Sequence, residues 1–353
     1  MPYSTGQAGT LSFPPKNSFH VKLKLAPAIP TRYNPSHTLA EDRLQEETMA
    51  SYCYFNKQFV PLSEAKIGVM TQALHYGTGL FEGIRSNWNA EKEQMYAFRL
   101  KEHFQRLEDG ARLLKINLGH TVDEMCELSV ELARRCDLKE DAYIRPLAYK
   151  STEQMGVRLH NLEDNFLIFA IPWGRYLDTD SCRCGVSSWR RPDDNVIPPS
   201  VKATGIYINN ALAKTEAVEN GFDEAIMLSP DGHVSEGSGE NIFLVIDGKL
   251  HTPAATCNIL KGITRDTVIQ LARNELGIET AERVIDRAEL YNADECFLTG
   301  TAAHLTPVGE IDHRRIGRSQ PGPITAKLQQ LYFDTIKGNL PQYLSWCTPV
   351  YNV

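Results

Sequence analysis

Residues 75–85 read His-Tyr-Gly-Thr-Gly-Leu-Phe-Glu-Gly-Ile-Arg. Three glycines and two aromatic residues fall within this short segment, a content that a plain strand would not carry. Because glycine has no Cβ, it lets a ligand approach the backbone closely. We therefore expect residues 75–85 to lie against a bound ligand.

Two further segments combine glycine with threonine. Residues 262–266 read Gly-Ile-Thr-Arg-Asp and precede a helical pattern that includes Val268 and Leu271. Free backbone N–H groups and the Thr264 hydroxyl would then meet at a helix N-terminus, which suits a phosphate. Residues 300–303 read Gly-Thr-Ala-Ala and also suit an anion. Ordinary helix capping remains the alternative for the first segment.

A third polar segment lies between two strand patterns. Residues 234–241 read Val-Ser-Glu-Gly-Ser-Gly-Glu-Asn. Glu236 could point into the protein there, although a loop carboxylate is more often solvated. Composition alone leaves its role open.

The composition excludes several classes of function. The chain has 353 residues, 42% of them hydrophobic, so it can bury a large core. Its 37 Lys and Arg residues are outnumbered by 44 Asp and Glu residues, and a net charge of −7 argues against a nucleic-acid partner. The longest apolar runs, such as Ile242–Ile246, are strand-sized and far shorter than the roughly 18 residues that cross a bilayer. We therefore expect a soluble protein with no membrane partner.

Familiar motifs of other enzyme classes are missing. No Gly-x-Gly-x-x-Gly follows a strand, and neither a P-loop nor a His-Glu-x-x-His pattern occurs, which argues against dehydrogenases, P-loop enzymes and zinc proteases. Eight cysteines are scattered without a Cys-x-x-Cys pair, and Cys182 with Cys184 is only a weak metal signal. We expect reduced thiols in the cytoplasm and no bound metal.

The order of strand and helix patterns predicts an α/β protein of the α+β type with two domains. Residues 1–40 hold no acidic residue and six prolines, which fits an N-terminal arm and leaves organelle targeting as the alternative. Between Trp173 and Val201 the sequence turns polar and proline-rich, which marks a connection. The predicted division is an arm over 1–47, a small domain over 48–172, a linker over 173–186 and a large domain over 187–353.

Apolar periodicity predicts helices over 101–115, 208–220 and 323–338. Thr121 and Glu124 form a capping box that would open a further helix. The spacing in the second of these helices is carried by Ile208, Leu212, Thr215 and Val218.

Together these segments resemble the pyridoxal-phosphate-dependent transaminases of fold type IV, and within that family the branched-chain-amino-acid aminotransferases. The likeness runs from about Tyr54 to Gly309. The motifs that carry it are residues 76–85, 143–146, 202–241, 262–265, 300–303 and 306–308. The resemblance implies a two-domain enzyme with the cofactor between the domains, a large cofactor-binding domain, and a homodimer or higher oligomer.

The resemblance places the cofactor's Schiff base on Lys202. A lysine in that role needs burial near a cationic ring, because both lower the pKa of the amine and make it nucleophilic. Glu236 is similar to the carboxylate that pairs with the pyridine nitrogen, and Tyr207 to the tyrosine that bonds the phenolic oxygen. The implied phosphate-binding residues are Arg106, Ile263, Thr264 and Thr301.

The substrate pocket implied by the resemblance accepts both an apolar side chain and that of glutamate. Its apolar walls match Phe81, Gly83, Val157, Trp173 and Tyr176. Its α-carboxylate end matches Tyr143, Ala302 and Ala303. Its γ-carboxylate end matches Arg145 and Tyr76, and both Tyr76 and Val157 would come from the neighbouring subunit.

The implied reaction is transfer of the amino group of L-leucine, L-isoleucine or L-valine to 2-oxoglutarate in a ping-pong mechanism. The implied partners are therefore amino acids and 2-oxo acids. Three alternatives share the fold: a D-amino-acid transaminase, an R-selective amine transaminase and an aminodeoxychorismate lyase. A catalytically inactive regulator that binds the cofactor is the alternative from another class.

Overall fold

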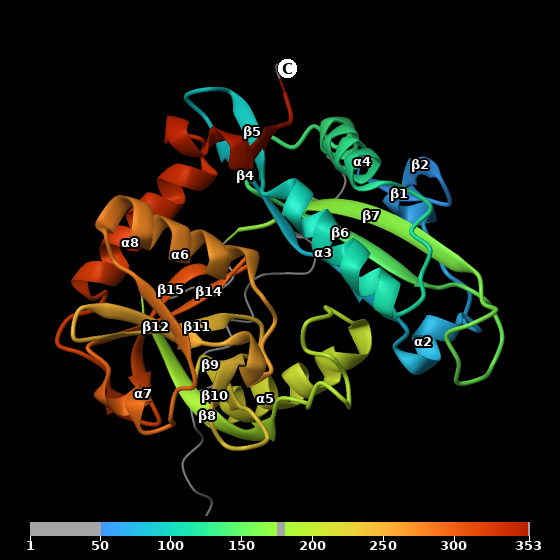
Figure 1. Cartoon of the computed structure of the whole chain (residues 1–353). Coiled ribbons are helices and arrows are strands. Elements are labelled where there is room, and N and C mark those ends of the chain that lie inside the picture. Colours follow the sequence, from blue (N-terminus) through green and yellow to red (C-terminus); the bar gives the residue numbers. More distant parts are fainter. Residues whose placement is uncertain (1–50, 175–180, 352–353) are drawn as a thin grey trace, which may run out of the picture. The chain divides into compact units, whose positions relative to one another are not determined.

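A computed structural model describes residues 51–174 and 181–351. Two β-sheets dominate this part of the chain (Figure 1). The described residues belong to one compact unit, while the expected arm over 1–47 lies outside them. The mixture of helices with two sheets agrees with the predicted α/β fold class.

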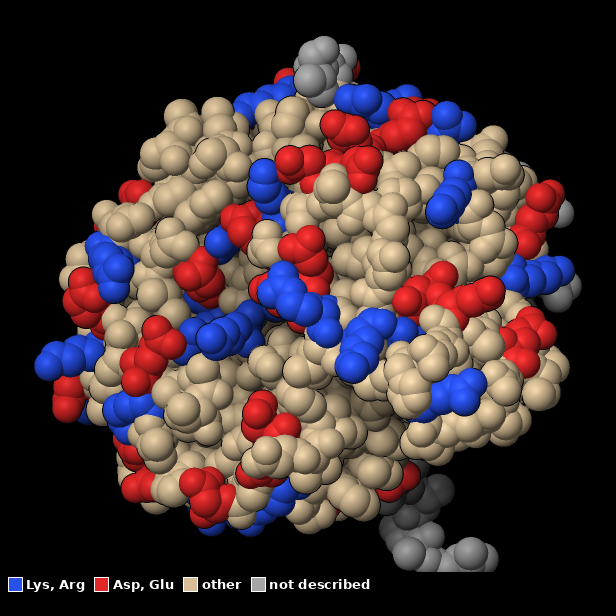
Figure 2. All heavy atoms as spheres, turned by 45° about the vertical axis from the view of Figure 1, so that its right-hand side comes forward, with Lys and Arg blue, Asp and Glu red and all other residues tan. Residues whose placement is uncertain are grey.

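The surface carries charges of both signs. Figure 2 shows one face, on which Lys and Arg side chains are interspersed with Asp and Glu side chains. Among the described residues, no helix is long and apolar enough to cross a membrane.

The first sheet is antiparallel throughout and has the order β17-β5-β4-β6-β7-β1-β2, with β3 paired to β6. Its strands are β1 (Tyr52–Phe55), β2 (Gln58–Pro61), β3 (Gly79–Phe81), β4 (Ile84–Asn89), β5 (Gln94–Phe98), β6 (Ala142–Lys150), β7 (Asp164–Pro172) and β17 (Cys347–Pro349). Around it lie the helices α2 (Gln72–Tyr76), α3 (Leu100–Leu113) and α4 (Val122–Arg135) and the 3-10 turns η1 (Leu62–Glu64) and η4 (Pro341–Trp346).

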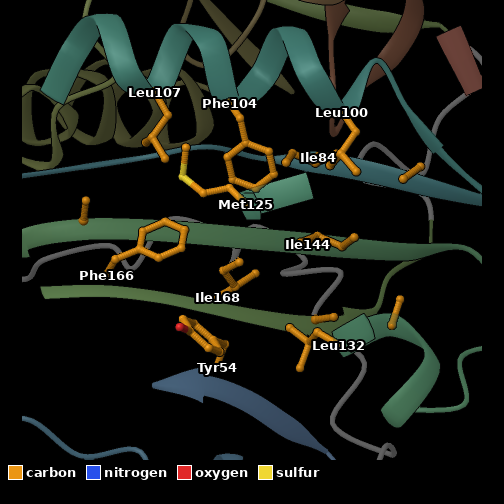
Figure 3. Packing of buried hydrophobic residues seen from close by; sticks show 14 of the residues in the cluster. Tyr54, Ile84, Leu100, Phe104, Leu107, Met125, Leu132, Ile144, Phe166 and Ile168 are labelled. Carbon is orange, nitrogen blue, oxygen red and sulfur yellow. The ribbon is translucent and has the colours of Figure 1, made fainter. Parts of the chain in front are cut away.

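The core of this half forms where α3 and α4 pack on the first sheet. Leu100, Phe104 and Leu107 recur at helical spacing on α3 and point toward the strands, where each is at most 1% exposed (Figure 3). Burying side chains of this size contributes about 1.5–3 kcal/mol each. The predicted capping box of α4 is confirmed, because Thr121 Oγ1 accepts from Glu124 N and Glu124 accepts from Thr121 N.

The second sheet is mixed, with the order β10-β9-β8-β15-β14-β11-β12-β13 and β16 paired to β15. Its strands are β8 (Cys182–Arg190), β9 (Glu224–Leu228), β10 (Val234–Gly237), β11 (Asn241–Ile246), β12 (Lys249–Pro253), β13 (Thr280–Arg283), β14 (Glu295–Gly300), β15 (His304–Ile311) and β16 (Arg314–Arg315). Its helices and turns are η2 (Thr204–Ile206), α5 (Tyr207–Glu219), η3 (Ala255–Cys257), α6 (Ile263–Leu276), α7 (Glu289–Asn292) and α8 (Pro323–Ile336). Here α5 packs on β8 and β9, whereas α6 and α8 pack on β14.

The helix predicted over 208–220 is present as α5, but its apolar residues do not face the core. Ile208 is 69% exposed and Val218 is 54% exposed. The buried side of α5 instead carries Asn210, Ala213 and Ala217. Alanine lets the helix lie close to the sheet, so small residues rather than large ones form the contact.

The connection expected between Trp173 and Val201 is only partly a connection. β7 ends at Pro172, and β8 already begins at Cys182 in the second sheet, within the range expected to be a linker. β17 belongs to the first sheet, although every strand of the second sheet precedes it in the sequence. The division into domains over 48–172 and 187–353 therefore remains a proposal.

Candidate active site

A cavity of about 270 Å³ lies between the two sheets. Strands β3 and β6 of the first sheet and β10 and β14 of the second contribute to its walls. The residues singled out in the sequence that line it are Phe81, Gly83, Arg106, Tyr143, Arg145, Trp173, Lys202, Tyr207, Glu236, Ile263, Thr264, Thr301 and Ala302. The structure therefore brings segments far apart in the chain into one site.

The backbone around Lys202 is held by the glycine-rich segment 75–85. Lys202 O accepts a hydrogen bond from Phe81 N at 3.1 Å, and Thr204 Oγ1 donates to Gly77 O at 2.9 Å. A Cβ on Gly77 would stand 2.8 Å from the Cα of Gly205, and Gly77 has a φ of +64°. Glycine is thus required there by the close approach of another backbone, where the sequence had suggested a ligand.

The side chain of Lys202 lies against two aromatic rings. Its Nζ is 5.3 Å from the centroid of Phe81 and 5.4 Å from that of Tyr207. Burial lowers the pKa of Lys202, but Tyr207, Glu82 and Tyr143 raise it, and the net pKa is raised. Among the chain's own residues these groups outweigh burial, and the lowered pKa expected beside a cationic ring stays a prediction.

Glu236 sits on β10 as a buried carboxylate with three donors. Its Oε1 accepts from Arg191 Nη2 at 2.9 Å, and its Oε2 accepts from Asn241 Nδ2 and Leu260 N, both at 3.0 Å. Burial raises the pKa of Glu236, and Arg191 is the strongest opposing influence. The solvated alternative for this carboxylate is wrong, since Glu236 is 5% exposed.

Sequence reasoning missed Arg191. It is 3% exposed, and its Nη1 donates to Asn210 Oδ1 at 2.9 Å while its Nη2 bonds Glu236. Asn210 in turn donates to Ser238 O. Nothing in the sequence pattern distinguished this arginine from a surface one, because its partner lies far along the chain.

A second buried carboxylate, Glu240, lines the same cavity. It is 4% exposed and its Oε2 accepts from Gly239 N at 3.0 Å. Burial, followed by the nearby charge of Glu224, raises the pKa of Glu240 from 4.5 to about 8. Glu240 therefore holds a proton at neutral pH.

Glu240 makes stability depend on pH. Because its pKa is raised in the folded state, its stabilisation is complete below pH 4.5 and is lost as the pH rises through about 8. We expect Glu240→Gln, which cannot titrate, to gain stability relative to the native chain over this range, by on the order of a few kcal/mol. Thermal unfolding midpoints at pH 5, 7 and 9 measure this. A difference between the two proteins that stays constant with pH would contradict it.

The N-terminus of α6 forms another wall of the cavity. The first intrahelical hydrogen bond runs from Asp266 N to Gly262 O, so the N–H groups of Ile263 and Thr264 precede it. A Cβ on residue 262 would stand 2.0 Å from the Oδ1 of Asn241, so a larger residue would displace the Asn241 side chain, which bonds Glu236. Such a helix end attracts a phosphate.

Another part of the cavity lining combines aromatic rings with the guanidinium of Arg145. Arg145 Nη2 donates to Tyr143 OH at 2.9 Å, and the Arg145 guanidinium lies 4.3 Å from the Phe81 ring centroid. The rings of Tyr143 and Trp173 are 5.3 Å apart. A Cβ on Gly83 would stand 2.0 Å from Tyr143 OH, so Gly83 leaves room for that hydroxyl.

Three predicted substrate residues, Tyr76, Val157 and Ala303, do not line the cavity of the described chain. Tyr76 OH accepts from Gly156 N at 3.2 Å, and Val157 beside it is 88% exposed. Ala303 is buried next to the lining residue Ala302. Tyr176 lies outside the described residues.

The chain matches a known family over residues 79–311. That family is described as amino-transferase class IV, and its match covers most of the two sheets and every wall of the cavity named above. The chain belongs to the class IV aminotransferases.

Individual relatives narrow the class. A probable branched-chain-amino-acid aminotransferase of Aquifex aeolicus is 49% identical over 85% of this chain and 97% of its own length. The structure of the branched-chain aminotransferase from Thermoproteus uzoniensis with norvaline has a TM-score of 0.82 and 45% identity, over 85% of this chain and 100% of that one. The branched-chain amino acid aminotransferase from Thermobaculum terrenum in PLP-form has a TM-score of 0.82 and 41% identity, over 86% and 99%. Within its class, the chain is a member of the branched-chain-amino-acid aminotransferase family.

Proposed function

We propose that this chain transfers the amino group of L-leucine, L-isoleucine or L-valine to 2-oxoglutarate by a ping-pong mechanism, with pyridoxal phosphate as cofactor. One observation carries the proposal. A single cavity holds the Lys202 amine, the buried Glu236 carboxylate, a helix N-terminus and an apolar wall with one arginine. The names of the relatives, including the structure in PLP-form, support the same reaction.

The residues present fit the cofactor. Thr299 lines the cavity, and its Oγ1 is buried and has no hydrogen-bond partner among the described residues. An anionic group with several acceptor oxygens would satisfy it together with the N-terminus of α6. Arg106, Ile263, Thr264 and Thr301 would hold the phosphate. Tyr207 and Glu236 would hold the phenolic oxygen and the ring nitrogen.

Each residue has a task in the reaction. Bound pyridoxal phosphate supplies an electron sink for the pair left at Cα when the proton departs. Lys202 Nζ anchors the cofactor and carries that proton to and from Cα. The Glu236 carboxylate would keep a proton on the ring nitrogen, and Arg191 favours the charged form of that carboxylate.

The lining accounts for two kinds of substrate. Phe81 and Trp173 offer apolar surface to a leucine, isoleucine or valine side chain. Arg145 Nε is buried and has no hydrogen-bond partner among the described residues, so it remains available to the γ-carboxylate of glutamate. Tyr143 and the backbone of Ala302 and Ala303 would hold the α-carboxylate.

We propose a homodimer whose partner completes the pocket. Exposed apolar side chains gather on two segments that Gln72 joins by hydrogen bonds to Gly156 O and Arg158 O. They are Ile67, Val69, Met70, Leu74, Met155 and Val157. A second copy covering them would bring Tyr76 and Val157 to the neighbouring cavity. We also propose a cytoplasmic location, which the eight free cysteines support.

The substrate class is tested by half-reactions. L-leucine alone should convert the yellow holoenzyme to its colourless pyridoxamine form, and 2-oxoglutarate should restore the colour. D-alanine should leave the spectrum unchanged. A response to D-alanine instead would place the enzyme among D-amino-acid transaminases. A protein that stays colourless after addition of pyridoxal phosphate would overturn the role of Lys202.

A further inference from the structure

Glu82 is a buried carboxylate outside the cavity lining. It lies between β3 and β4 within the segment 75–85, and it is 1% exposed. Its Oε1 accepts from Arg106 Nε at 2.7 Å, and its Oε2 accepts from Arg106 Nη2 at 2.8 Å and from His103 Nδ1 at 2.7 Å. His103 and Arg106 are three residues apart on α3, so both reach the same carboxylate.

The hydrogen bonds of Arg106 leave two donors for a ligand. A guanidinium has five N–H groups. Two are bonded to Glu82, and one on Nη1 is bonded to Lys261 O at 2.9 Å. Within the described chain, one N–H remains on each terminal nitrogen. Arg106 lines the cavity close to the N-terminus of α6, where two parallel donors suit a phosphate.

The charge of Glu82 does not itself attract a phosphate. Burial would raise the pKa of Glu82, but Arg106 and His103 outweigh burial and hold it below its usual range. Glu82 is therefore ionised and cancels the charge of Arg106. Glu82 can contribute to an anion site by orienting the Arg106 guanidinium. Without such a partner, an arginine side chain on a helix would sample many rotamers.

We propose that Glu82, itself held by His103, is a positioning residue that fixes the Arg106 guanidinium so that its two remaining N–H donors face the cofactor phosphate. The proposal rests on the proposed function, since it presumes pyridoxal phosphate in the cavity. The competing explanation is that the ion pair only stabilises the contact between α3 and the first sheet.

Two ligands separate these explanations. The full chain, purified as holoenzyme and then freed of cofactor by dialysis, is titrated with pyridoxal phosphate and with pyridoxal, which lacks the phosphate. Glu82→Asp keeps the negative charge but shortens the side chain by one methylene group, whereas Glu82→Gln keeps the size of the side chain and removes its charge. In both variants we expect the Kd for pyridoxal phosphate to rise about tenfold or more, the worth of one charge-assisted hydrogen bond, while the Kd for pyridoxal stays within about twofold.

Two controls complete the test. Glu295→Gln changes a buried carboxylate that caps α8 through Ile324 N and Thr325 N, and it should alter neither affinity. In an Arg106→Met background, Glu82→Gln should add no further loss of pyridoxal phosphate affinity.

Several outcomes overturn the inference. Equal weakening of both ligands by the Glu82 variants would make the ion pair structural, and unchanged affinity for pyridoxal phosphate would remove any role in its binding. In either case the proposed function stands. A native chain that does not bind pyridoxal phosphate at all would instead overturn the proposed function, and this inference with it.

Discussion

Replacing Lys202 with alanine should abolish transamination and the yellow colour of the holoenzyme while leaving the fold in place. Lys202 is the amine held against the Phe81 and Tyr207 rings, and its backbone, which Phe81 N bonds, does not depend on the side chain. The loss should exceed about 10⁴-fold, the upper end of what a general acid–base group contributes. Steady-state rates, the visible spectrum and circular dichroism measure the three parts of this expectation.

A second buried lysine is the matched control. Lys150 is 1% exposed and pairs with Asp164 at 2.8 Å, outside the cavity lining. Lys150→Met should destabilise the chain by about 3–5 kcal/mol, because it leaves the Asp164 carboxylate with the Asn117 N–H but without a cation, and should keep the cofactor spectrum. Transamination retained in Lys202→Ala would refute the mechanism.

Glu236→Gln should lower the turnover number by about 10²–10³-fold, as does the loss of one preorganised electrostatic group. The amide keeps the volume of the carboxylate but loses the negative charge that would stabilise a protonated ring nitrogen. It also turns an N–H₂ group toward donors, since Arg191, Asn241 and Leu260 all donate to Glu236 in the native chain. Single-turnover rates with L-leucine and a pH titration of the cofactor absorbance measure the effect.

The expected pattern is specific to the reaction. Glu236→Gln should still bind pyridoxal phosphate through the phosphate-binding residues, so its spectrum should shift rather than vanish. The Glu295→Gln control should leave the turnover number unchanged. A loss smaller than about tenfold in Glu236→Gln would contradict the assigned role, because one charge-assisted contact alone is worth that much.

The sequence predicted local structure best. The capping box of Thr121 and Glu124 and the start of α8 at Pro323 depend on neighbouring residues, and both are as expected. The family motifs in the sequence also predicted site residues, and most of these residues line one cavity. Ile208 on α5 shows the limit, because apolar spacing gives the helix but not which of its sides meets the sheet.

The parts that escaped prediction depend on long-range contacts. Glu82, Arg191 and Asn210 are polar residues whose default place is the surface, and each is buried by partners distant in sequence. The raised pKa of Lys202 reflects Tyr207, five residues along the chain, and also Glu82 and Tyr143, which only the folded chain places nearby. The spacing of apolar residues along the sequence does not predict such contacts between distant polar residues.

The placement of β17 affects how the chain can fold during synthesis. β17 (Cys347–Pro349) covers the edge of β5, and Gln94 on β5 accepts hydrogen bonds from Val350 N and Tyr351 N. Since a ribosome delivers the chain from its N-terminus, β5 emerges long before its partner does. Until then the nascent protein exposes the unpaired N–H and C=O groups of a sheet edge, which invite pairing with other chains. A chain terminated before Cys347 keeps this edge open, and chaperones rather than its own sequence must then protect it.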